Sequence, residues 1–141
     1  MKIPFNLPWV YRPGSSDEEN AVVLRHLLEC LVAIDTEYLS RHHTPLLRES
    51  GVRYGRTYEW DSVPSVLKKG VADCKSLTAW DVAERRMRGE KARAIFKVYP
   101  SRFGAPDFHI WTETPNGEID TSAELGMGGY IRDQARLRRM G

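Results

Sequence analysis

The amino-acid sequence predicts an α+β fold in which a cysteine-bearing helix packs on a small antiparallel sheet. Apolar residues recur at helical spacing over residues 17–41 and 74–88. Apolar and polar residues instead alternate over residues 92–99 and 107–113, which is typical of strands. A turn rich in proline and glycine follows the second of these strands and predicts a hairpin.

Length and composition indicate one ordinary globular domain over residues 1–141. Hydrophobic residues make up 41% of the chain and charged residues 28%, and 141 residues can bury a single core. The net charge of +2 does not by itself point to nucleic acid. No apolar run is long enough to cross a membrane, and the first residues lack the apolar core of a signal peptide. We expect a cytoplasmic protein with Cys30 and Cys74 as reduced thiols.

The two ends of the sequence differ from its centre. Residues 1–14 are rich in proline, which fixes φ and removes a backbone donor, so we expect an extended arm. Residues 128–141 are rich in arginine, which we interpret as a solvated basic tail or as a contact with an acidic partner. Either segment is a candidate docking site for another protein.

The helix predicted at residues 17–41 opens with a capping box, in which Ser16 is the N-cap and Glu19 reaches back to it. Cys30 lies beside the apolar stripe of this helix, and we expect it to be a buried core thiol, because free cysteine is among the most buried residue types. The stripe expected to be buried consists of Leu24, Leu27, Leu28, Leu31, Ile34 and Tyr38.

Residues 46–60 are broken by two glycines and predict short extended pieces. A short helix is expected over residues 63–70, with Pro64 in its first turn and Gly70 ending it. Trp60 immediately precedes this helix. It is a candidate to wall a cleft, and a core aromatic is the alternative.

The stretch around Cys74 is the centre of the functional prediction. Asp73 is expected to cap the helix over residues 74–88, and Gly89 to end it. Cys74 then lies in the first turn, where the positive end of the helix dipole favours thiolate over thiol. Lys75 adds a positive charge nearby. The helix is expected to bury a stripe made of Leu77, Trp80, Ala83 and Met87.

Alternation assigns side chains to the two faces of the predicted sheet. In the strand at residues 107–113, His109 shares a face with Trp111, which makes Trp111 a candidate to line the same cleft. A third strand is expected at residues 118–121, and it carries Asp120.

The register of the hairpin decides whether His109 and Asp120 can meet. If Pro115 and Asn116 are the central residues of the turn, as a type I turn prefers, Asp120 faces Trp111 across the ladder. It is then diagonal to His109, roughly 7–8 Å away between backbones, which the two side chains can span. A turn centred one residue later would place Asp120 opposite Glu113, one residue pair further from His109 than the two side chains can span.

These residues have the chemistry of a nucleophilic triad. We predict that Cys74 is the nucleophile, His109 the base and Asp120 the group that orients the imidazole. The backbone N–H of Cys74 is a natural oxyanion donor at a helix start. Trp60 and the backbone near Asp73 are candidates for a second donor.

The combination of motifs resembles the transglutaminase-like superfamily, which belongs to the wider papain-like cysteine fold. The resemblance rests on Gly70 through Cys74, on His109-Ile110-Trp111, and on Asp120 at the end of the next strand. It is strongest with small stand-alone members commonly encoded by tailed bacteriophages. The further motifs shared with those members are Trp60, Val63-Pro64 and Leu125-Gly126-Met127.

Two departures from the family pattern prevent a transfer of substrate preference. Lys75-Ser76 stands where an acidic pair is common, and Thr121 stands where proline commonly follows the aspartate. Neither departure removes a residue of the triad.

The resemblance implies acyl transfer through a thioester on Cys74, with a protein or peptide as substrate. We expect water as the acceptor, hence a peptidase or amidase, because a cross-linking transamidase must exclude water and bind an amine. The alternatives are such a transamidase, or a phage virion or assembly component with little catalysis. A phage-encoded protein would lie in the host cytoplasm or in the virion, and its arm or tail would contact a phage structural protein or a host protein. No cofactor or metal is expected, since the histidines and cysteines show no ligand spacing.

Overall fold

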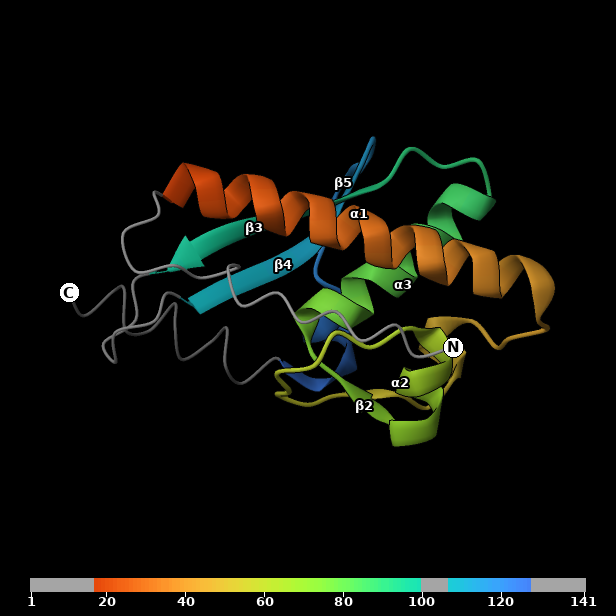
Figure 1. The fold of residues 1–141 in the computed structure, drawn as a ribbon. Coiled ribbons are helices and arrows are strands. Elements are labelled where there is room, and N and C mark those ends of the chain that lie inside the picture. The colour runs from red at the N-terminus through yellow and green to blue at the C-terminus, as the bar shows by residue number, and fades with distance from the viewer. Residues whose placement is uncertain (1–16, 100–106, 128–141) are drawn as a thin grey trace.

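The computed structural model describes residues 17–99 and 107–127, and these residues form the expected α+β fold (Figure 1). The predicted arm at residues 1–14, the Ser16 cap and the basic tail at residues 128–141 lie outside the described part of the chain. In chain order the elements are α1 (Asp17–Arg41), the short turn η1 (Leu47–Glu49), β1 (Arg53–Tyr54), α2 (Val63–Lys69), β2 (Val71–Ala72), α3 (Cys74–Met87), β3 (Arg93–Tyr99), β4 (Asp107–Thr114), β5 (Gly117–Ile119) and the turn η2 (Ala123–Met127).

The strands of the described residues form two small sheets. β3, β4 and β5 are antiparallel in that order, and β1 pairs with β2 in a parallel two-stranded sheet. β3 pairs with β4 from end to end, whereas β5 pairs only with the last three residues of β4. The third strand was predicted at residues 118–121 and instead ends at Ile119. β2, immediately before α3, was not predicted.

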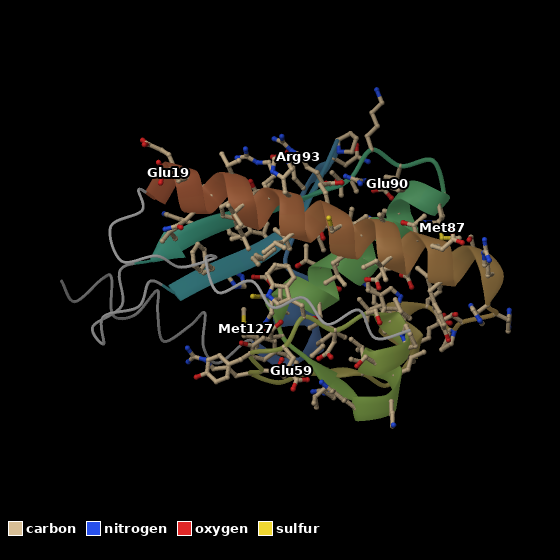
Figure 2. The ribbon with its side chains drawn as sticks, in the orientation of Figure 1. Glu19, Glu59, Met87, Glu90, Arg93 and Met127 are labelled. Carbon is tan, nitrogen blue, oxygen red and sulfur yellow. The ribbon has the colours of Figure 1, made fainter. Side chains whose placement is uncertain are left out.

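α3 is the central element of the fold. All of its residues from Ser76 to Glu84 are buried, and it lies between α1, α2 and the larger sheet (Figure 1). The predicted stripe is correct for Leu77, Trp80 and Ala83, but Met87 is 47% exposed in the last turn (Figure 2). Gly89 follows with φ of +81°, as the predicted helix end requires.

The buried carboxylate of Asp81 in α3 is paired by one residue of the same helix and by residues of two other elements. Asp81 is fully buried and accepts hydrogen bonds from Arg48 (2.7 Å), Arg85 (2.9 Å) and Thr112 (2.8 Å). Burial alone would raise the pKa of Asp81, but these three hydrogen bonds outweigh it and hold the pKa below its ordinary value. Asp81 is therefore a charged carboxylate that joins η1, α3 and β4.

α1 packs along the molecule against α3 and against the sheet face that carries Ile110 (Figure 1). Its helical bounds are those predicted, but its buried face is rotated from the predicted one. Cys30 and Ile34 are exposed and were predicted wrongly as core residues. The buried face consists of Leu24, Leu28, Leu31, Val32 and Asp35. Across the described residues, no helix combines the length and apolar content that a membrane span requires.

Asp35 links α1 to the start of α2. One of its carboxylate oxygens accepts the backbone N–H of Val63 at 2.9 Å, and the other has no hydrogen-bond partner within the described residues. Burial raises the pKa of Asp35 to about 8, although the bond from Val63 acts in the opposite direction. Asp35 therefore carries a proton in the folded protein at neutral pH.

We expect Asp35 to make the folded state less stable as pH rises. Between its ordinary pKa of 3.8 and about 8, the folded protein retains a proton that the unfolded chain has lost. The free energy of unfolding should therefore fall between pH 5 and pH 8. Asp35→Asn should reduce that fall by more than about 1 kcal/mol, since one pKa unit is worth about 1.4 kcal/mol.

Urea denaturation at pH 5 and pH 8 measures this difference. Glu37→Gln is the matched control, because Glu37 is an exposed carboxylate on the same helix. If Asp35→Asn and the wild type lose the same free energy between the two pH values, Asp35 is not protonated in the folded protein.

Candidate active site

Cys74 is the first residue of α3, and its side chain is half-buried. Asp73 stands at the N-cap position with extended backbone angles, as predicted, but makes no side-chain capping hydrogen bond. Its buried carboxylate instead pairs with Lys75. Burial raises the pKa of Asp73 despite the opposing charge of Lys75. The sequence predicted the position of Asp73 correctly and its bonding incorrectly.

Lys75 holds a loop segment against the start of α3. Its ammonium group pairs with Asp73, donates to the backbone carbonyl of Thr57 at 3.3 Å and lies 5.8 Å from the ring centre of Trp60. A carboxylate next to the ammonium offsets much of its field at Cys74. Lys75 is therefore better described as a tether for the segment ending at Trp60, which is 38% exposed, than as a source of charge for the sulfur.

His109 and Asp120 meet as the hairpin prediction requires. Thr114 pairs with Gly117, so Pro115 and Asn116 are the central residues of the turn, and the predicted register is confirmed. His109 Nε2 lies 2.7 Å from Asp120 Oδ2, within hydrogen-bond distance.

Asp120 is itself held in place by the turn that follows it. Its Oδ1 atom accepts the backbone N–H of Ala123 at 3.1 Å, and its backbone carbonyl accepts the N–H of Glu124 at 3.1 Å. One carboxylate oxygen therefore caps η2 while the other contacts His109. Because each oxygen has its own partner, the direction in which the carboxylate points is fixed.

Trp111 supports the imidazole from a second side. The rings of Trp111 and His109 are stacked, with centroids 5.6 Å apart and planes inclined by 22°. Trp111 Nε1 donates to Glu118 at 2.9 Å, which fixes the indole ring. Glu118 was not identified from the sequence, although the register places it on the same face as Trp111 and Asp120.

Cys74 and His109 come together where the start of α3 meets β4. The thiol lies 3.9 Å from the backbone carbonyl of Phe108, the residue before His109. Burial disfavours the imidazolium, but hydrogen bonds to Asp120 and to Cys74 outweigh this and raise the pKa of His109 to about 9. The contact with Asp120 uses Nε2 and leaves Nδ1 as the ring nitrogen available to the thiol. The three residues predicted as a triad thus form one constellation.

A shallow hollow of about 570 Å³ lies at the opposite end of α3, lined by the turn at Gly89–Arg93 and by Glu113. It contains none of the predicted site residues. Within residues 17–99 and 107–127, no three His, Cys, Asp or Glu side chains are grouped so that they could hold a metal ion.

Comparison with known proteins found no matching family model, no matching curated protein and no matching solved structure. A functional assignment for this chain therefore rests on the geometry and chemistry of its own residues.

We expect Asp120→Asn to lower the pKa of His109. The substitution removes a charge-assisted hydrogen bond that favours the imidazolium, and its loss should shift the titration midpoint down from about 9 by one unit or more. NMR titration of the histidine ring protons measures the midpoint directly, with exposed His26, His42 and His43 as references in the same sample. Glu118→Gln is the control, because Glu118 bonds to Trp111. An unchanged midpoint in Asp120→Asn would show that the carboxylate does not stabilise the imidazolium.

Proposed function

We propose that this protein is a cysteine-dependent acyl-transfer enzyme, a peptidase or amidase, with Cys74, His109 and Asp120 as its triad. The observation that carries the proposal is that two groups act on one imidazole: the carboxylate of Asp120, 2.7 Å from His109 Nε2, and the thiol of Cys74 both raise its pKa. Acyl transfer through a thioester requires a nucleophile, a base that contacts it, and a group that orients the base.

The arrangement supports a defined series of steps. His109 takes the proton of Cys74, and the thiolate attacks the carbonyl carbon of the substrate. The backbone N–H at the start of α3 faces the developing oxyanion, where the helix dipole also favours negative charge. The imidazolium then protonates the leaving amine, and a thioester forms on Cys74. Attack by water, deprotonated by His109, releases the acid and regenerates the thiol.

The high pKa of His109 suits this mechanism. A raised pKa makes the imidazole a stronger base toward the thiol, and the imidazolium that results holds the proton needed by the leaving amine. The charge of Asp120 balances the imidazolium throughout the cycle. This explains why a carboxylate, rather than a neutral group, lies on the far nitrogen.

Hydrolysis is favoured over transamidation by the exposure of the site. The side chains of His109 and Asp120 are 16% and 25% exposed, so water can reach the base. A cross-linking enzyme has to keep water from its thioester. We therefore propose a protein or peptide substrate with water as the acceptor.

The resemblance to the transglutaminase-like superfamily also supports the proposed acyl-transfer function. The residues that carry the resemblance, Cys74, His109-Ile110-Trp111 and Asp120, are those that form the constellation. A helix with the nucleophile at its start, packed against an antiparallel sheet that carries the base, is consistent with a papain-like fold. We propose the same phage-encoded setting for this chain.

Selective labelling of Cys74 tests the proposed function without knowledge of the substrate. Cys30 is the internal control, because it is the more exposed of the two thiols and exposure alone would make it the more reactive. We expect iodoacetamide at pH 7 to modify Cys74 at least about tenfold faster than Cys30, because the thiolate is the reactive form.

His109→Ala should abolish this advantage, whereas His26→Ala, an exposed histidine on α1, should preserve it. Mass spectrometry of the modified peptides gives both rates in one experiment. Equal rates at the two cysteines, or no effect of His109→Ala, would contradict the proposed function.

A further inference from the structure

Among residues 17–99 and 107–127, no strand covers the edge of β4 next to the triad. In an antiparallel ladder, alternate residues direct their backbone groups to the same side, so Phe108 and Ile110 face the same way as Thr112. Thr112 pairs with Ile119, the last residue of β5, and β5 extends no further. The backbone groups of Phe108 and Ile110 therefore face the space beyond the end of β5, where an unpaired strand edge would need other partners.

α3 occupies this space and supplies the partners. The thiol of Cys74 lies 3.9 Å from the carbonyl of Phe108, and the hydroxyl of Thr78 donates to the carbonyl of Ile110 at 3.1 Å. One turn later, the hydroxyl of Thr112 donates to Asp81 at 2.8 Å. Successive turns of α3 thus contact alternate residues of β4.

The spacing of this ladder follows from the geometry of the two elements. The four residues from Cys74 to Thr78 rise about 6 Å along the helix, and the two residues from Phe108 to Ile110 rise about 6.7 Å along the strand, so these two contacts match in spacing. A translation of α3 along β4 would break all the contacts together.

We propose that Thr78 is a positioning residue that sets the distance between Cys74 and His109, an inference that rests on the proposed function. Thr78 lies one turn after Cys74, and its acceptor Ile110 is the residue after His109. Its hydrogen bond therefore ties the helix that carries the nucleophile to the strand residue next to the base. Thr78 has no exposed surface, so its hydroxyl bonds to Ile110 in an environment of low dielectric constant.

Packing alone does not explain a hydroxyl at this position, because valine would fill the same space. Apolar contacts tolerate small sliding movements, whereas a buried donor with one acceptor specifies a position along the strand. Displacement by about 1 Å is enough to lower the rate of a positioned reaction about a hundredfold. The hydroxyl of Thr78 thus supplies the register that apolar packing lacks.

The test compares Thr78→Val with Thr78→Ser in the full chain. Thr78→Val removes the hydroxyl at nearly constant volume, and Thr78→Ser keeps it. We expect Thr78→Val to slow iodoacetamide labelling of Cys74 by about tenfold or more, relative to Cys30, and to lower the NMR titration midpoint of His109, because the contact with the thiol weakens. Thr78→Ser should retain both values close to those of the wild type. Thr36→Val is the matched control, since the hydroxyl of Thr36 donates to Val32 within α1.

The outcomes separate this inference from the proposed function. If Thr78→Val labels at the wild-type rate with an unchanged His109 midpoint while His109→Ala slows labelling, the positioning role is wrong and the triad stands. If His109→Ala also has no effect, the proposed function fails. If Thr78→Val does not fold, Thr78→Ala and Thr78→Ser are compared instead, because they differ only in the hydroxyl. Equal labelling in those two variants would overturn the proposal.

Discussion

The buried carboxylate of Asp81 is the constraint on which the rest of the structure depends. A charge inside a protein must be paired, and Asp81 is paired by Arg48 in η1, by Arg85 on its own helix and by Thr112 on β4. These bonds, together with the hydrogen bond from Thr78 to Ile110, fix the position and rotation of α3 against the sheet. The position of Cys74, two turns earlier on the same helix, follows from that attachment. The candidate active site is thus a consequence of how the central helix is anchored.

Much of the site was predictable because it is set by local chemistry. Alternation assigned His109 and Trp111 to one face of a strand, and the preference of proline for the first central position of a turn gave the hairpin register. With those two facts, Asp120 could lie only diagonal to His109, and the structure has this register. Helix bounds were predictable for the same reason, since Gly70 and Gly89 both adopt the positive φ that ends a helix.

The errors concern choices that depend on distant residues. α1 carries apolar residues around much of its circumference, so its period alone did not identify the buried face. Asp35 is buried there because its partner, the N–H of Val63, comes from another helix 28 residues away. Cys30 and Ile34 are exposed in consequence. β5 is short because α3 occupies the edge of β4, which no local pattern in residues 118–121 reveals.

The central claim is that Cys74 and His109 form one coupled pair, and the pKa of His109 in Cys74→Ala tests it most directly. Both the thiol and Asp120 contribute to raising that pKa to about 9. NMR titration of the histidine rings in wild type and Cys74→Ala isolates the part due to the thiol. We expect the midpoint of His109 to fall in the variant while those of His26, His42 and His43 stay constant. An unchanged midpoint for His109 would show that the two groups do not interact, and would contradict the assignment of Cys74 as the nucleophile of a triad.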